Sequence, residues 1–104
     1  MIRALFAAAF VSGAALAPSA LAQGVDPNLG RNLAAACASC HGTNGVSQLG
    51  MPNLAGQQRT YLVQQMQDFR AGKRQATIMH QIAKGYTDEQ IDALAAYFSE
   101  QRAR

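Results

Sequence analysis

The segment Cys37-Ala38-Ser39-Cys40-His41 constrains this chain more than any other part of its sequence. Two cysteines three residues apart, followed at once by a histidine, form the attachment sequence for a c-type haem. On one helical turn, each thiol can bond to one of the two adjacent vinyl groups of the ring. His41 then lies beneath the ring, where its imidazole can bind the iron. The motif therefore predicts one haem c, held covalently by Cys37 and Cys40 and ligated by His41.

Two other chemistries are open to these side chains. The cysteines could form a disulfide or a thioredoxin-like redox pair, but such a pair accompanies a βαβ pattern that the sequence lacks. A zinc ion could use both cysteines together with His41 and His80. However, the neighbours Cys40 and His41 are poorly placed to share one tetrahedral ion, and the sequence has no second pair of cysteines. Haem attachment is the favoured prediction.

A haem iron with two protein ligands needs its second ligand from the opposite face of the ring. The candidates that follow the motif are Met51, Met66, Met79 and His80. Met66 falls on the apolar stripe of a predicted helix, and Met51 follows the attachment site too closely. Met79 lies far enough along the chain to reach the other face, and its soft thioether stabilises ferrous iron. We expect Met79 as the ligand, with His80 or an open position as the alternative.

The N-terminal segment has the pattern of an export signal. A positive start precedes an apolar run from Ala4 to Leu16, and Ala20 and Ala22 are the small residues that a signal peptidase requires. The run is too short to cross a bilayer, which takes ~20 residues. We therefore expect residues 1–22 to be a cleaved signal peptide and residues 23–104 to be one monohaem domain, exported to the periplasm and not inserted in a membrane.

Apolar spacing beyond residue 22 predicts helices and no strands. Caps and apolar stripes place these helices at 26–36, at 58–70, at 79–84 and from the capping box 87–90 onward. The last helix has a predicted buried face made by Ile91, Leu94, Ala95 and Phe98. The segment 42–56 is rich in Gly, Asn, Ser and Pro, which predicts a loop with a turn at Asn44-Gly45. The expected fold is all-α, with about four helices around one haem.

Composition supports a cofactor in the centre of the domain. The chain has no Trp, and a domain this small usually needs a staple beyond its apolar core. A net charge of +3, without any run of Lys or Arg, gives no reason to expect nucleic-acid binding. The basic side chains that could dock a partner or contact the haem propionates, if they do not simply face solvent, are Arg59, Arg70, Lys73, Arg74 and Lys84.

With these motifs in place, residues 23–104 resemble a class I cytochrome c along nearly their whole length. The segment Gly50-Met51-Pro52-Asn53-Leu54 is similar to the loop that supports the proximal histidine in that family. The resemblance implies that the Pro52 carbonyl accepts a hydrogen bond from His41 and orients its ring. It also implies that Leu54 packs on the haem.

The same resemblance implies a crossing of the first and last helices. Gly30 and Leu33 match the position on the first helix at which the last helix crosses in that family. Leu94 and Tyr97 are therefore expected to contact them.

A narrower resemblance concerns the electron donor. Several segments from Pro52 to Gly85 are similar to bacterial cytochromes with two tandem haem domains, although this chain has one attachment site. The segment Ala76–Thr87 resembles the haem subunit of flavocytochrome c sulfide dehydrogenase. This resemblance implies that the chain is a non-catalytic subunit that accepts electrons from a flavoprotein and passes them to other redox proteins. The alternatives are a free, diffusible carrier between respiratory complexes and, less favoured, a sensor with an open iron position.

Overall fold

The structure is a computed structural model, which describes residues 9, 12–15, 24, 26–48 and 50–103. Most of the expected signal peptide, including the cleavage site after Ala22, lies outside these residues. In the part of the chain that is described, no helix is long and apolar enough to span a membrane.

Helices make up the regular secondary structure of the described residues, and the all-α prediction is confirmed. In chain order they are α1 (Leu29–Ala34), η1 (Ala35–Cys37), α2 (Ala38–His41), η2 (Thr43–Gly45), α3 (Arg59–Ala71), α4 (Met79–Ala83) and α5 (Asp88–Ser99). Because α1, η1 and α2 follow one another without a break, they act as one helical segment beside α3, α4 and α5.

The first helical segment differs from its prediction at both ends. It begins at Leu29, because the Asp26 carboxylate accepts the Asn28 N–H at 2.8 Å and the Asp26 carbonyl accepts the Leu29 N–H at 3.0 Å. These bonds form a turn ahead of the helix. The predicted end at Ala36 was also wrong, because the helical path continues to His41. The whole Cys-x-x-Cys-His motif therefore lies on helix.

Helices α3 and α4 begin and end within one residue of their predicted bounds, and α5 begins at the predicted capping box. Gly72 ends α3 in the left-handed conformation, with φ 74°. The predicted capping box opens α5: the Gln90 N–H donates to Thr87 Oγ1 at 3.2 Å, and the Thr87 N–H donates to Gln90 Oε1 at 3.0 Å. Such a box satisfies two backbone donors that a helix start otherwise leaves free.

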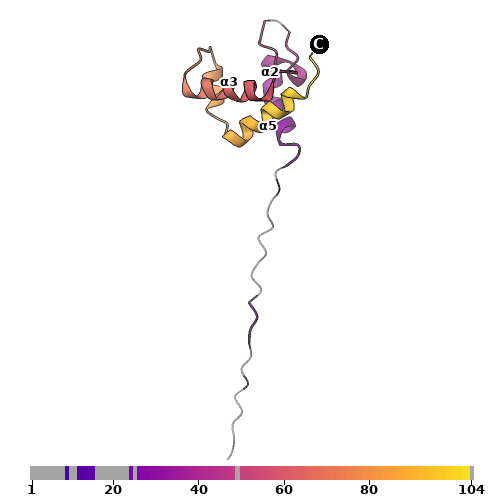
Figure 1. Cartoon of the computed structure of the whole chain (residues 1–104), viewed down its shortest axis with the longest axis vertical. Coiled ribbons are helices and arrows are strands. Elements are labelled where there is room, and N and C mark those ends of the chain that lie inside the picture. The colour runs from indigo at the N-terminus through magenta and orange to yellow at the C-terminus, as the bar shows by residue number, and fades with distance from the viewer. Residues whose placement is uncertain (1–8, 10–11, 16–23, 25, 49, 104) are drawn as a thin grey trace, which may run out of the picture.

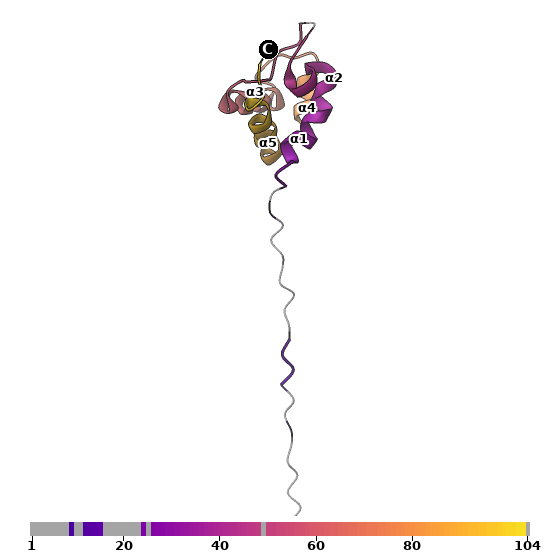
Figure 2. The ribbon, with the colours of Figure 1, turned by 90° about the vertical axis from the view of Figure 1, so that its right-hand side faces the viewer.

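Helix α5 is the element around which the others pack. It contacts α1 on one side and α3 on another, and α3 also contacts α4 (Figures 1 and 2). A Cβ on Gly30 would collide with the carbonyl oxygen of Ala93 and lie 3.0 Å from Tyr97 Cβ. Only glycine therefore allows α1 and α5 to cross this closely, and the expected contact between Gly30 and Tyr97 is present.

The apolar core is small. Its buried side chains are Ala34, Ala55, Leu62, Ala83, Ile91, Leu94, Ala95 and Phe98, half of which are alanines. The four predicted buried residues of α5 are among them. On α3, by contrast, Tyr61 is 48% exposed and Met66 is half-buried, so the predicted stripe is buried mainly at Leu62. Leu33 and Leu54 pack against the core from its edge.

Candidate cofactor centre

The two cysteines of the motif are free thiols three residues apart, with Cys37 at the end of η1 and Cys40 in α2. Cys37 is half-buried against the core, and Cys40 is exposed. Burial raises the pKa of the Cys37 thiol, and the nearby Cys40 raises it further. Tyr86 lies close to Cys37, and its pKa is also raised, first by burial and then by the proximity of Cys37. One thiol of the pair, that of Cys37, therefore lies at the edge of the core, and the other, that of Cys40, lies at the surface.

His41 is buried, and one of its ring nitrogens is already engaged. Its Nδ1 lies 2.7 Å from the carbonyl oxygen of Pro52, to which Nδ1–H donates. This is the contact that the resemblance implied. With Nδ1 as the donor, the neutral ring keeps its lone pair on Nε2, which is the nitrogen available to a metal.

The reversal of the chain after His41 depends on glycine. Gly42 has φ 83°, and a Cβ there would collide with the carbonyl oxygen of Val46. The following loop is closed by Gly45, whose carbonyl accepts the N–H groups of Leu54 at 2.9 Å and Ala55 at 3.1 Å. These bonds bring the loop back, so that Pro52 faces the end of α2.

The loop is also fixed to α5. The Tyr97 hydroxyl donates to Asn44 Oδ1 at 2.6 Å, although Asn44 has the unusual φ of 55°. A Cβ on Gly45 would lie 2.7 Å from Phe98 Cδ1 and 2.8 Å from Leu54 Cβ. Leu54 is thus half-buried next to Phe98, at the edge of the core.

Both candidates for the sixth ligand stand at the start of α4. Met79 and His80 are half-buried neighbours on that helix. Nδ1 of His80 is buried and has no hydrogen-bond partner among the described residues. A buried nitrogen without a partner is costly, and a group bound beside α4 would relieve that cost.

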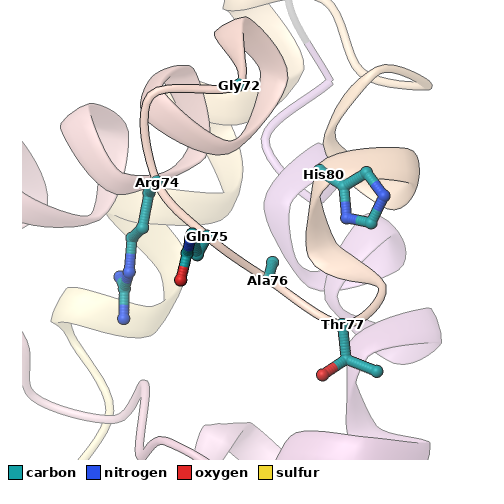
Figure 3. A pocket seen from close by; sticks show the side chains of 6 residues that line it. All are labelled: Gly72, Arg74, Gln75, Ala76, Thr77 and His80. Atoms are coloured by element: carbon teal, nitrogen blue, oxygen red, sulfur yellow. The ribbon is translucent and has the colours of Figure 1, made fainter.

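A cavity of about 640 Å³ lies along the connection between α3 and α4 (Figure 3). In that view, Arg74, Gln75 and Thr77 project from the connection in one direction, and His80 projects from α4. The full lining comprises Gly72, Arg74, Gln75, Ala76, Thr77 and His80. The cavity thus borders one of the two candidate sixth ligands.

Three of the five basic residues singled out in the sequence have partners within the molecule. Arg59 forms an ion pair with Asp92, which joins α3 to α5. Arg70 pairs with Asp88 and also donates to the Tyr86 carbonyl at 3.2 Å. The third is Arg74, which donates to Gln65 Oε1 and whose guanidinium carbon lies 4.6 Å from the centre of the Phe69 ring. Lys73 and Lys84 are exposed.

The donor set suits a covalently bound haem. Two thiols, a histidine with a free Nε2 and a methionine supply the groups that two thioether bonds and two iron ligands require. Among the residues that the structure describes, no three of His, Cys, Asp and Glu come together in a way that could hold a metal ion, which is the kind of set that a zinc site needs. The fold and this centre thus define a small helical haem protein.

The chain belongs to the cytochrome c family, whose family model matches residues 28–101. It accordingly carries one covalently bound haem c with iron, for which Cys37 and Cys40 are the two cysteines of the attachment sequence, and it functions in electron transfer.

Relatives of this chain include proteins named for a sulfide dehydrogenase and a thiosulfate dehydrogenase. The chain is 40% identical over 74 residues to the cytochrome subunit of sulfide dehydrogenase from Chlorobaculum tepidum, a match over 71% of this chain and 67% of the relative. It is 47% identical over 70 residues to a thiosulfate dehydrogenase electron acceptor from Stutzerimonas stutzeri, which covers 64% of this chain and 32% of that protein.

The fold is also similar to that of a solved structure. Reduced recombinant cytochrome c4 from Pseudomonas stutzeri matches with a TM-score of 0.64 and 30% identity, over 74% of this chain and 50% of that chain. The present chain therefore spans about a third to two thirds of the length of these three proteins.

Sequence reasoning did not identify the side chains that hold the loop around Pro52. Ser47 and Asn53 make hydrogen bonds within the loop, and Tyr97 fixes Asn44 from α5. The available signal was weak: Asn and Ser often bond to nearby backbone in turns, but the sequence does not show which backbone group is within reach.

Proposed function

We propose that this protein is a periplasmic haem subunit that accepts electrons from the flavin subunit of a sulfide dehydrogenase. The observation that carries this proposal is the 40% identity to a cytochrome subunit of sulfide dehydrogenase, two thirds of which the chain covers. The segment Ala76–Thr87, which contains the candidate sixth ligands, supports the same donor.

We propose that His41 and Met79 would bind the iron of the haem. Bound haem supplies a reversible one-electron couple between ferrous and ferric iron. The protein's part is to hold these ligands in place during that change. Pro52 fixes the ring of His41 through Nδ1, while the short helix α4 carries Met79. A carrier of this kind needs little rearrangement in either oxidation state, because its ligands stay the same.

A second candidate is a carrier that diffuses between partners and accepts electrons from a thiosulfate dehydrogenase. The relative from Stutzerimonas stutzeri, which is named as the electron acceptor of that enzyme, favours this candidate. The two candidates share the haem site and differ in the donor and in the permanence of the complex.

Purification from periplasm separates the two candidates. A subunit of a sulfide dehydrogenase is expected to co-purify with a yellow, flavin-containing polypeptide at constant stoichiometry through successive columns. A small red monomer that elutes alone at every step would contradict the proposed subunit and support the diffusible carrier.

The same preparation tests the proposed export signal. Mass spectrometry of the purified holoprotein is expected to show a chain that begins at Gln23 and carries the mass of one haem. A holoprotein that still begins at Met1 would contradict cleavage after Ala22.

A further inference from the structure

The loop that presents Pro52 to His41 is held by side-chain hydrogen bonds on both sides of the proline. Before it, the Ser47 hydroxyl donates to the carbonyl of Met51. After it, Asn53 accepts the Ser47 N–H on Oδ1 at 3.1 Å and donates from Nδ2 to the Ala55 carbonyl at 2.9 Å. We call these three hydrogen bonds the Asn53 brace.

We infer that the Asn53 brace positions the Pro52 carbonyl on His41 and thereby sets the strength of the His41 ligand. Asn53 and Ser47 act as positioning residues, because neither contacts His41 directly in the described hydrogen bonds. This inference rests on the proposed ligation of iron by His41. It goes beyond that proposal because it names the side chains that control the ligand's hydrogen bond.

The location of the brace explains why the proline needs it. Pro52 is exposed, and its ring nitrogen has no hydrogen to donate, so its own backbone cannot anchor it to the loop. The backbone closure at Gly45 fixes only Leu54 and Ala55. Without the brace, the peptide that carries the Pro52 carbonyl is held from one end alone. With the brace, Asn53 and Ser47 hold this peptide from both ends.

The chemical consequence follows from the hydrogen bond on Nδ1. A histidine that donates this proton to a well-placed carbonyl becomes a more basic ligand at its other nitrogen. A more basic ligand favours ferric iron over ferrous iron and lowers the reduction potential. Loosening the brace should weaken the bond to Pro52 and raise the potential, while Met79 is left unchanged.

The test uses the holoprotein and the variant Asn53→Ala. The first readout is the exchange with solvent of the His41 Nδ1 proton, followed by NMR in the ferrous state. The second is the reduction potential from a redox titration. We expect the proton of the variant to exchange several-fold faster and the potential to shift upward. Gln48→Ala is the matched control. Gln48 is exposed in the same loop, and its side chain makes no hydrogen bond to the described residues.

Two Ser47 variants keep the inference testable if Asn53→Ala does not mature. Ser47→Ala removes the bond to the Met51 carbonyl without any change in charge, and it should move both readouts in the same direction by a smaller amount. Ser47→Thr keeps the hydroxyl and should restore the values of the unaltered protein. A brace that only stabilises the loop would lower the melting temperature and leave both readouts unchanged, and that result would overturn the inference.

The unaltered holoprotein distinguishes this failure from a failure of the proposed ligation. If His41 binds the iron, its ring protons are strongly displaced by the ring current of the haem. Undisplaced His41 signals would contradict the ligation itself. Displaced signals with variants that behave like the unaltered protein would contradict only the brace.

Discussion

His41 and Met79 bring different chemistry to the proposed iron site. His41 has one nitrogen committed to the Pro52 carbonyl and one free for the metal, which makes it a fixed and basic ligand. Met79 offers a soft, uncharged sulfur that favours the ferrous state. His80 stands beside Met79, and its Nδ1 has no hydrogen-bond partner in the described part of the chain, so the local structure brings two candidate donors to the same end of α4.

A pair of alanine variants distinguishes these donors. Met79→Ala should abolish the weak far-red absorption of the ferric protein that arises from iron–sulfur ligation, and it should lower the reduction potential. His80→Ala, the matched control from the next position, should keep the band. Absorption spectra of the two ferric holoproteins decide the question. A band that survives in Met79→Ala would show that Met79 is not the ligand.

At the scale of elements, the crossing of α1 and α5 determines where the loop that supports Pro52 lies. Gly30 lies against the Ala93 carbonyl and Tyr97 Cβ, with no room for a side chain. The same α5 carries Phe98, which touches the loop at Gly45. A change in the crossing therefore displaces the loop that supports Pro52, as well as the two helices.

Substitution of Gly30 tests this dependence. Gly30→Ala should force the helices apart and reduce the free energy of unfolding by about 1–3 kcal/mol, the usual cost of overpacking. The melting temperature of the holoprotein should fall by about 4–8 °C for each kcal/mol. Gly85→Ala is the control, because its Cβ would meet only the Ile82 carbonyl oxygen at an ordinary 3.4 Å. Equal melting temperatures for the two variants would contradict the close crossing.

At this scale the sequence predicted some elements well and others poorly. The bounds of α3 and α4 and the start of α5 were predictable because apolar stripes, Gly72 and the Thr87 capping box are local signals. The start of the first helix was not, since the Asp26 carboxylate caps a turn instead of the helix. The contact between His41 and Pro52 could be foreseen only through resemblance, because it depends on a loop path that no local pattern encodes.

At the scale of the whole molecule, the residues that the structure describes form a small apolar core. Half of the buried hydrophobic residues in the described chain are alanines, and Ile91 is the one large side chain there that is less than 2% exposed. A domain of this size gains only ~3–5 kcal/mol from such a core and usually depends on a staple. The covalent haem, which stays attached in the unfolded chain as well, is expected to act as that staple because folding buries its large apolar ring against the core.

Removal of the attachment points tests this dependence. The double variant Cys37→Ser/Cys40→Ser should lose the covalent haem and, with it, most of the cooperative thermal transition followed by circular dichroism. Ser39→Ala, a control inside the same motif, removes only a 3.3 Å bond to the Ala36 carbonyl and should keep both. A double variant that melts at the temperature of the holoprotein would show that the polypeptide core is sufficient.

The direct test of the proposed electron donor is the rate at which the ferric haem is reduced under anaerobic conditions. The oxidised holoprotein is mixed with sulfide, with and without the flavoprotein subunit of a sulfide dehydrogenase, and its absorption is followed in time. The proposed function predicts rapid reduction that needs both sulfide and catalytic amounts of the flavoprotein. Reduction at the same slow rate with and without the flavoprotein would contradict it.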